Sequence, residues 1–263
     1  MTQLKPQEIL EVTIDAAVKK SQLSVRRMIL LGILAGAFIA LAGSGANMAG
    51  YYLLADPATN GLGKMISGCI FPAGLILVVF AGAELFTGNN LMLTAVLDKK
   101  ISVSSMLQNW IIVYLANLAG SILIAWMVSY SGLLETGGGM LKEVTISIAS
   151  AKTSLPLGQA FVRAIMCNFL VCLAVWLATA ADSTIGKIFS IFFPIWLFVT
   201  AGFEHSVANM FFIPAGIFAD GGATAGLTWS SFFINNLIPV TLGNIIGGSL
   251  LVGGLYYYIY KRA

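Results

Sequence analysis

The sequence predicts an all-α membrane protein with six transmembrane helices. Hydrophobic residues make up 58% of the 263 residues and charged residues only 10%, whereas soluble domains carry about 25% charged residues. The mean hydropathy is +0.90, and six apolar runs are long enough to cross a bilayer. This composition excludes a soluble cytosolic enzyme. It also excludes a disordered chain, which needs low hydrophobicity and high charge.

An amphipathic helix is predicted over residues 6–20, before the first apolar run. Leu10, Ile14 and Ala17 share one face at helical spacing. Acidic residues come first and lysines come last, an order that suits the helix dipole. We expect this helix to lie along the membrane surface or to pack on a neighbouring helix.

The six predicted spans are separated by breaks rich in charge, proline or glycine. Asp56 and Pro57 follow the first span, and charged residues 98–100 follow the second. Three glycines at 137–139 lie between the third and fourth spans. The predicted spans cover residues 28–54, 65–97, 105–130, 158–181, 187–213 and 236–260.

Basic residues predict that both termini lie in the cytoplasm. With an even number of spans the termini share one side, and the side richer in Lys and Arg is cytoplasmic. We therefore assign residues 1–27 to a cytoplasmic N-terminal amphipathic helix and residues 28–263 to a six-span transmembrane domain. Ten basic residues fall on the terminal side and four on the other, namely Lys5, Lys19, Lys20, Arg26, Arg27, Lys99, Lys100, Lys187, Lys261 and Arg262 against Lys64, Lys142, Lys152 and Arg163.

The second and fifth predicted spans carry the same motif. Residues 81–90 and 201–210 align without gaps, and both contain Ala-Gly-x-Glu with an asparagine five residues after the glutamate. A Phe-Pro pair precedes each motif. An Asn-x-x-Gly motif at Asn117 in the third span returns at Asn244 in the sixth. These matches indicate a duplicated three-span unit.

The two copies are predicted to be inverted repeats, at about 28–130 and 158–260. Because three is an odd number, the second copy enters the membrane from the opposite face. Paired glycine-interrupted helices at corresponding positions point to a transport site near the membrane midplane. We therefore expect the second and fifth helices to be broken at the shared motif.

Glu84 and Glu204 are the only acidic residues deep inside the predicted spans. An unpaired carboxylate is expensive in lipid, so each should face the protein interior. Because each lies at a predicted break, we expect it to accept hydrogen bonds from free backbone N–H groups and to hold the break in shape. A direct role in proton movement is the alternative. Asn89 and Asn209 are expected to satisfy backbone groups at the breaks.

His205, the only histidine, and Thr87 are the candidates for direct contact with a transported solute. An ionisable residue inside the membrane is a functional candidate by default, and imidazole can change its charge near neutral pH. A hydroxyl can donate to an anion or accept from a protonated group. The alternative for Thr87 is a bond to a free carbonyl of its own helix.

Apolar side chains near the breaks are candidates to line narrow, dry constrictions, although ordinary packing is the alternative for each. Such constrictions make crossing costly for a bare ion. The candidates are Phe71, Leu75, Leu85 and Phe198.

Neither a metal site nor a cofactor site is predicted. Cys69, Cys167 and Cys172 all lie inside apolar stretches without metal-ligand spacing, so we interpret them as packing residues. No run of Lys and Arg suits nucleic acid. An intramembrane enzyme would need a paired nucleophile and base or a metal cluster, so we expect no enzymatic activity.

Several segments resemble the formate/nitrite transporter family. They are Glu-Leu-Phe-Thr-Gly-Asn at 84–89, Cys-Asn-Phe-Leu-Val-Cys at 167–172, Glu-His-Ser-Val-Ala-Asn-Met at 204–210 and Asn-Leu-Ile-Pro-Val-Thr-Leu-Gly-Asn at 236–244. Together with Lys152 they follow the family's order from the first span to the sixth. The Glu-His-Ser stretch is the most specific of them.

The resemblance implies an aquaporin-like fold with inverted repeats, a pore in each protomer and assembly as a homopentamer. It also implies roles for single residues. Thr87 would lie in the loop that breaks the second helix, and His205 would be the central histidine. Lys152 and Asn168 would form an anion-attracting pair at the outer vestibule, and the four apolar candidates would be constriction residues.

The function expected from the resemblance is transport of a small monovalent anion, with formate as the first choice. The anion would move with a proton through a pore in the cell membrane of a bacterium or archaeon. Nitrite, hydrosulfide or another small monocarboxylate is the alternative within the family. A neutral-solute channel of the aquaporin kind is the alternative outside it, although paired Asn-Pro-Ala boxes are absent from the sequence.

Overall fold

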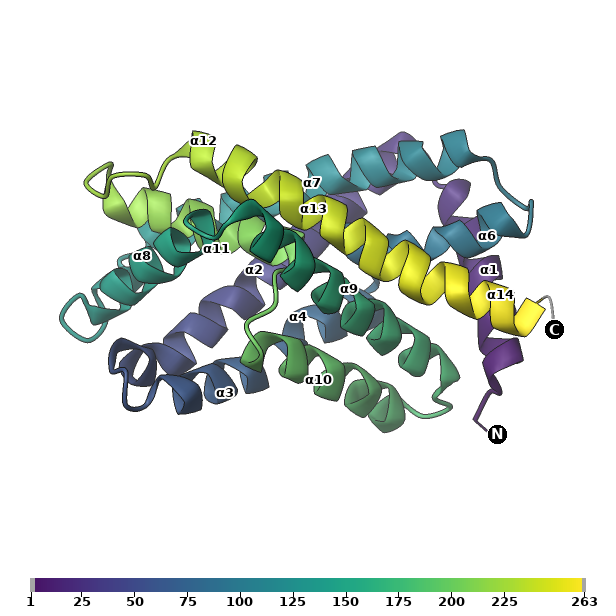
Figure 1. Ribbon diagram of the computed structural model, residues 1–263, viewed down its shortest axis with the longest axis horizontal. Coiled ribbons are helices and arrows are strands. Elements are labelled where there is room, and N and C mark those ends of the chain that lie inside the picture. The colour runs from purple at the N-terminus through teal and green to yellow at the C-terminus, as the bar shows by residue number, and fades with distance from the viewer. Residues whose placement is uncertain (1–2, 262–263) are drawn as a thin grey trace.

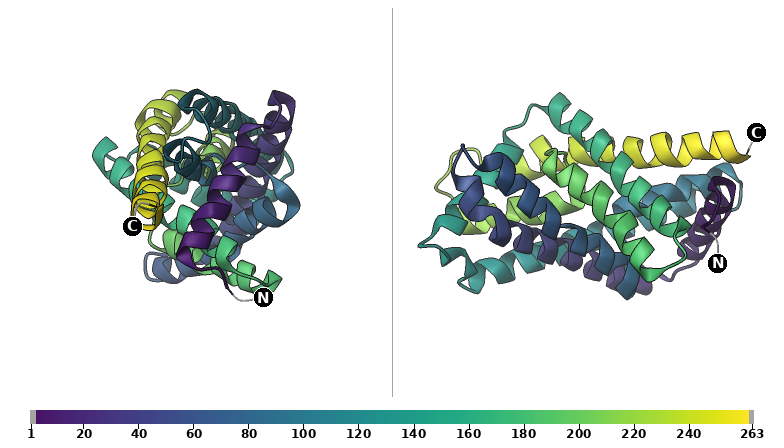
Figure 2. Two further views of the ribbon diagram at one scale, coloured as in Figure 1. Left: turned by 90° about the vertical axis from the view of Figure 1, so that its right-hand side faces the viewer. Right: turned by 90° about the horizontal axis from the view of Figure 1, so that it is seen from below.

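The computed structural model describes residues 3–261, in which every regular element is a helix (Figure 1). The first helix, α1 (Pro6–Ser21), is the one predicted over residues 6–20. It lies across the end of the helix bundle, close to the C-terminal helix (Figure 2). Its apolar face, which includes Leu10 and Ile14, is buried against the bundle.

The remaining elements follow in chain order. They are α2 (Val25–Ala55), α3 (Asn60–Ile70), α4 (Pro72–Leu77), η1 (Val78–Gly82), α5 (Phe86–Asn89), η2 (Asn90–Met92), α6 (Leu93–Leu97), α7 (Val103–Tyr130), η3 (Leu133–Glu135), α8 (Met140–Thr153), α9 (Leu157–Ala180), α10 (Thr184–Thr200), α11 (Ser206–Asp220), α12 (Trp229–Ser231), η4 (Phe232–Leu237), α13 (Ile238–Ile245), η5 (Ile246–Gly254) and α14 (Leu255–Lys261).

All six predicted spans correspond to helical segments. Among the described residues, five helical stretches are long and apolar enough to cross a membrane, and they cover 25–55, 60–82, 103–130, 157–180 and 229–261. The predicted fifth span is present as two shorter apolar helices, α10 and α11. Each predicted span therefore has a counterpart in the structure.

The second and fifth helices are broken at the shared motif. The second helix ends at Gly82 and resumes at Phe86, and the backbone at Leu85 is extended. The fifth ends at Thr200 and resumes at Ser206, with His205 extended. Gly82 and Gly202 both have positive φ angles, 79° and 73°, which glycine adopts without the steric cost that a side chain would bring. The glycines of the motif thus permit the turns that break the helices.

The longest helix that was not predicted is α8. Helix α8 lies between the third and fourth spans, and it resembles α1 in preceding a unit of three spans. Its charged residues Lys142, Glu143 and Lys152 lower its hydropathy, so no apolar run of span length is present there. The structural repeat therefore consists of a short helix followed by three spans.

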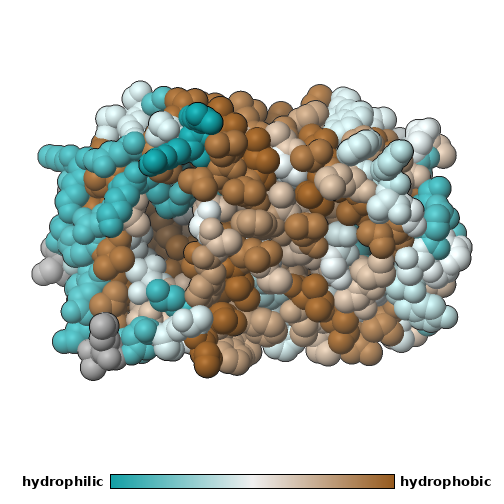
Figure 3. Space-filling model, turned by 180° about the vertical axis from the view of Figure 1, so that it is seen from behind, coloured by the Kyte–Doolittle hydropathy of each residue, from teal (hydrophilic) through white to brown (hydrophobic). Residues whose placement is uncertain are grey.

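The outer surface matches a protein surrounded by lipid. Figure 3 shows a broad band of hydrophobic side chains between a hydrophilic end, where α1 lies, and a less hydrophobic opposite end. Large apolar side chains in this chain are exposed on several helices, among them Ile111, Leu115, Phe193 and Leu242. Exposed apolar area of this extent favours contact with lipid or with other protomers over contact with water.

Glycines let the long helices approach each other closely in both repeats. A Cβ atom on Gly36 would overlap the backbone of Asn117, and one on Gly120 would overlap the backbone of Ile33, where α2 crosses α7. The second repeat has the same crossing, because a Cβ atom on Gly247 would overlap the backbone at Ile165.

Substituting Gly36→Ala is expected to destabilise the protein by about 1–3 kcal/mol, the usual range for overpacking. The new methyl group would meet backbone, which cannot move aside as a flexible side chain can. Thermal unfolding in detergent measures the loss. Gly158→Ala is the matched control, because a Cβ atom there has no neighbour within 4 Å. Equal stability of the two variants would contradict this account of the crossing.

Candidate functional site

Two cavities reach the helix breaks from opposite ends of the molecule. We call the first the α1 chamber. It has a volume of about 450 Å³ and is lined by residues that include Lys19, Lys20, Leu75, Glu84, Leu85 and Val175. We call the second the α8 chamber. It has a volume of about 170 Å³ and is lined by residues that include Asn47, Lys64, Phe71, Lys152, Phe198, Glu204, His205 and Phe212.

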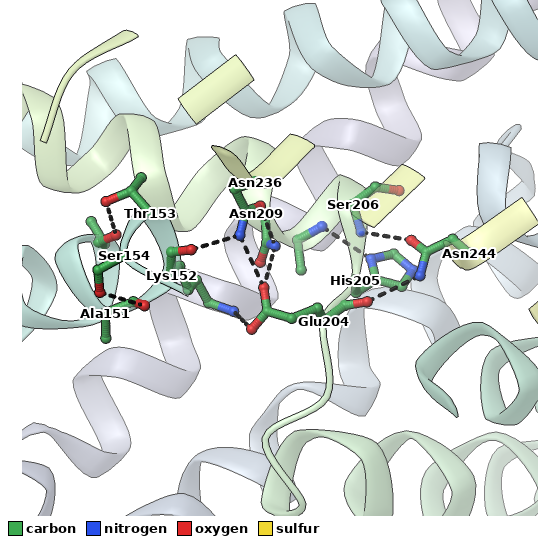
Figure 4. Close-up of polar contacts among 12 residues, drawn as sticks. Ala151, Lys152, Thr153, Ser154, Glu204, His205, Ser206, Asn209, Asn236 and Asn244 are labelled. Carbon is green, nitrogen blue, oxygen red and sulfur yellow. Dashed lines mark hydrogen bonds and ion pairs between the residues drawn. The ribbon is translucent and has the colours of Figure 1, made fainter. Parts of the chain in front are cut away.

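Glu204 is held at the second break by side chains from three other positions. Its Oε1 accepts from Nζ of Lys152 at 2.9 Å, and its Oε2 accepts from Nδ2 of Asn209 at 2.6 Å and of Asn236 at 3.3 Å (Figure 4). The glutamate is buried and the lysine side chain is 17% exposed. Nearly all of the acceptor capacity of the carboxylate therefore faces protein donors.

Glu84 is held in the same way at the first break. Nζ of Lys20 lies 2.6 Å from its Oε1, and Nδ2 of Asn89 lies 2.7 Å from its Oε2. Nδ2 of Asn89 also donates to Oδ1 of Asn109 at 2.8 Å, as Nδ2 of Asn209 does to Asn236 at 2.7 Å in the other repeat. The two halves of the chain thus contain equivalent polar networks.

The prediction of the hydrogen-bond partners of the two glutamates was wrong. We expected free backbone N–H groups, but lysine and asparagine side chains bind both carboxylates. For the same reason Asn89 and Asn209 bind carboxylates rather than backbone groups through Nδ2. A lysine reaches each site from the preceding short helix, and it offsets the charge of the buried carboxylate, which a neutral N–H group does not.

Two other asparagines bind free backbone groups at the breaks. Nδ2 of Asn117 donates to the carbonyl of Glu84 at 2.9 Å, and its Oδ1 accepts from the backbone N–H of Phe86 at 2.9 Å. Asn244 repeats both bonds in the second half, to the carbonyl of Glu204 at 3.0 Å and from the N–H of Ser206 at 2.8 Å. The repeated Asn-x-x-Gly motif thus supplies the side chains that fix the two breaks.

Thr87 and His205 connect the two breaks to each other. Oγ1 of Thr87 lies 2.9 Å from Nε2 of His205, and both residues are buried. Nδ1 of His205 accepts from the backbone N–H of Ala208 at 3.0 Å. A neutral ring with an acceptor at Nδ1 carries its proton on Nε2 and donates to Thr87. The hydroxyl proton of Thr87 is then left to donate elsewhere.

The predicted constriction residues lie on both sides of this pair. Leu75 and Leu85 line the α1 chamber, and Phe71 and Phe198 line the α8 chamber. The rings of Phe71 and Phe198 meet edge to face at a centroid distance of 5.7 Å, and Phe198 stacks on the His205 ring at 5.8 Å. The central polar pair therefore has apolar side chains toward each chamber.

Asn168 does not pair with Lys152 as the resemblance implied. It is fully buried on α9, and its Nδ2 donates to the carbonyls of Thr87 and Asn244 and to Oδ1 of Asn90. Asn168 lies four residues before Cys172, whose thiol also contacts the Thr87 carbonyl, at 3.3 Å. The amide thus joins backbone from the two repeats, and its place in the middle of a long helix keeps it away from the vestibule.

Sequence reasoning did not identify Lys20, Asn109 or Asn236 as site residues. Lys20 is the penultimate residue of α1 and Lys152 the penultimate residue of α8. Comparing the two short helices would have found Lys20, had α8 been predicted as a helix. Asn109 and Asn236 are polar residues within apolar runs, and this feature could have indicated them as site residues.

The comparisons with known proteins agree with this geometry. The family model described as Formate/nitrite transporter matches residues 7–258. The chain is 46% identical to a probable formate transporter of Methanothermobacter thermautotrophicus, over 92% of each chain. It is 36% identical to the formate channel FocA of Escherichia coli K12, over 98% of this chain and 95% of the relative.

Solved structures of similar sequence share the fold. A channel described as an FNT family ion channel superposes with a TM-score of 0.86 at 32% identity, over 95% of this chain and 98% of the other. A pentameric formate channel with formate bound gives a TM-score of 0.77 at 36% identity, over 90% and 98%. The family match over nearly the whole chain, together with these relatives, shows that the chain belongs to the formate/nitrite transporter family.

Proposed function

We propose that this protein is a membrane channel or transporter for formate, with a pore through each protomer of a homopentamer. The observation that supports it most is the hydrogen-bonded Thr87–His205 pair between two chambers that open at opposite ends. The names of the relatives favour formate, and a similar structure is a pentameric formate channel with formate bound.

The proposed path begins in a chamber and crosses the apolar side chains near the central pair. A bare carboxylate loses its hydration there, and desolvation disfavours the charged form of an acid. Formate therefore takes up a proton from the water of the chamber it leaves, directly or through His205, and crosses as formic acid. The hydroxyl of Thr87 donates a hydrogen bond to an oxygen of the crossing molecule. On the far side the proton returns to water, so anion and proton move together.

We propose that the protein lies in the cell membrane with both termini in the cytoplasm, so that the α1 chamber faces the cytoplasm and the α8 chamber faces outward. The basic residues support this orientation, and Lys99, Lys100 and Lys261 all lie at the α1 end. Arg262 and the last residue of the proposed 28–263 domain lie outside the described residues, as do the first two residues of the 1–27 segment.

Flux measurements in proteoliposomes test the proposed function. Formate uptake into the vesicles is expected to rise when the vesicle interior is more alkaline than the outside solution, because formate and a proton move inward together. Formate uptake that does not respond to a pH gradient would contradict coupled movement. Nitrite and hydrosulfide in the same assay distinguish the other anions of the family. Water permeation without any anion flux would favour the aquaporin-like alternative.

A further inference from the structure

The net charge of the α8 chamber comes from a residue outside the network at the break. Lys152 is paired with Glu204 at 2.9 Å, so the two opposite charges largely offset each other at a distance. Lys64 on α3 also lines this chamber and is exposed. It forms no ion pair within residues 3–261. The field that reaches a solute at the mouth therefore depends on Lys64 more than on Lys152.

The α1 chamber has the same balance of charges. Lys20 is paired with Glu84, while Lys19 lines the chamber without an ion-pair partner in the described chain. Lys19 lies on α1 and Lys64 on α3, so these free cations do not occupy equivalent positions in the repeats. Each chamber thus has a net positive lining, although the unpaired lysine comes from a different position in each half. This favours a role for the two lysines in attracting anions.

Asn47 adds a hydrogen-bonding group to the wall of the α8 chamber. Its side chain is only 6% exposed, it lines the chamber, and it has no hydrogen-bond partner among the described residues. Its amide atoms are not among the enclosed unpaired atoms of the described chain, so the amide is open to the chamber and its N–H groups can donate to a solute there. Every other buried asparagine forms side-chain hydrogen bonds, namely Asn89, Asn90, Asn109, Asn117, Asn168, Asn209, Asn236 and Asn244.

Asn47 and Lys64 reach the chamber from two helices that are held together at this level. The Ser67 hydroxyl on α3 donates to the carbonyl of Ala46 on α2 at 2.9 Å. Asn47 is the next residue on α2, and Lys64 lies one helical turn before Ser67 on α3. A hydrogen-bond donor and a free cation therefore line one chamber from neighbouring helices.

We propose that Asn47 and Lys64 form a binding site for the permeant anion in the α8 chamber, reached before the Thr87–His205 pair. This inference rests on the proposed function. The ligand is a small monovalent oxyanion, because the amide N–H can donate to one of its oxygens while the ammonium group supplies the charge. The site raises the local concentration of the anion and takes no part in the protonation step.

Formate efflux from oriented proteoliposomes tests the charge of Lys64. Protein captured through a tag at the C-terminus, at the α1 end, is reconstituted with its α8 chamber toward the vesicle interior, so that efflux begins in that chamber. We expect Lys64→Gln to raise the half-saturating formate concentration roughly three- to tenfold at low salt. At about 1 M salt the difference should disappear, because the Debye length is then about 3 Å.

Lys142→Gln is the matched control for this variant. It removes the same charge on the same side, but Lys142 is not among the residues that line the chamber. We expect its half-saturating concentration to stay within about twofold of the unmodified protein, since a surface charge outside the cavity is screened. If Lys64→Gln and Lys142→Gln behave alike, the site assigned to Lys64 is wrong.

Asn47→Ala tests the hydrogen bond. We expect the half-saturating formate concentration to rise roughly three- to tenfold, as for loss of one ordinary hydrogen bond in a chamber that water also enters, with the maximal flux kept. Asn47→Asp should raise it further, because the new carboxylate repels the anion. A folding defect would instead lower the maximal flux and leave half-saturation unchanged, and that pattern would overturn the proposal for Asn47.

The two proposals fail in different ways. If the unmodified protein carries no formate in these vesicles, then the proposed function itself is wrong. If it carries formate, but neither Lys64→Gln nor Asn47→Ala changes half-saturation, then only the binding site in the α8 chamber is wrong.

Discussion

Replacing Glu204 with alanine is expected to destabilise the protein by about 3–5 kcal/mol, the usual cost of removing one partner of a buried ion pair. The variant leaves the ammonium group of Lys152 without its carboxylate. It also leaves the amides of Asn209 and Asn236 without the acceptor that they share. The midpoint of thermal unfolding in detergent should fall by roughly 6–20 °C for a chain of this size.

Glu84→Ala is the internal control for this prediction, because the two halves of the chain have equivalent networks. The Lys20 side chain is 30% exposed, against 17% for Lys152. A more exposed lysine recovers more of its hydration when its partner is removed, so we expect a smaller loss for Glu84→Ala. The account of the buried pair would be contradicted if the Glu204→Ala variant were as stable as the unmodified protein. It would also be contradicted if Glu204→Ala cost less stability than Glu84→Ala.

The spans and their breaks could be predicted because their signals are local. An apolar run of sufficient length indicates a membrane span without knowledge of its neighbours. The shared motif at 81–90 and 201–210 located both breaks, since the glycines and the flanking polar residues are contiguous in sequence. The repeated Asn-x-x-Gly motif also identified Asn117 and Asn244. Their hydrogen bonds to the carbonyls of Glu84 and Glu204 could not be predicted from the sequence.

The partners of the buried glutamates could not be predicted because they come from distant parts of the chain. Lys20 is 64 residues from Glu84, and Lys152 is 52 residues from Glu204. Each lysine lies on a short helix outside the apolar runs, where a charged residue gives no signal of burial. For Asn168 the resemblance implied a place at the outer vestibule, but the residue is buried on the interior face of α9.

His205→Ala is expected to reduce formate flux about 10- to 100-fold and to weaken its pH dependence. The imidazole is the partner of Thr87, and without it the hydroxyl is no longer held in place to donate to the crossing molecule. Leaving a buried polar group without its partner costs about 1–3 kcal/mol, and each 1.4 kcal/mol corresponds to about tenfold. Flux in proteoliposomes across a range of pH measures the effect.

Thr87→Val separates the hydroxyl from the packing of this pair, because valine keeps the shape and removes only the donor. We expect a flux loss similar to that of His205→Ala, and the double variant should be little worse than either single one, since residues that act as a unit are not additive. Thr94→Val is the matched control, because that buried hydroxyl donates only to the carbonyl of Leu91. Losses that add fully, or flux and pH dependence unchanged by His205→Ala, would mean that the two side chains do not act together on the permeant molecule.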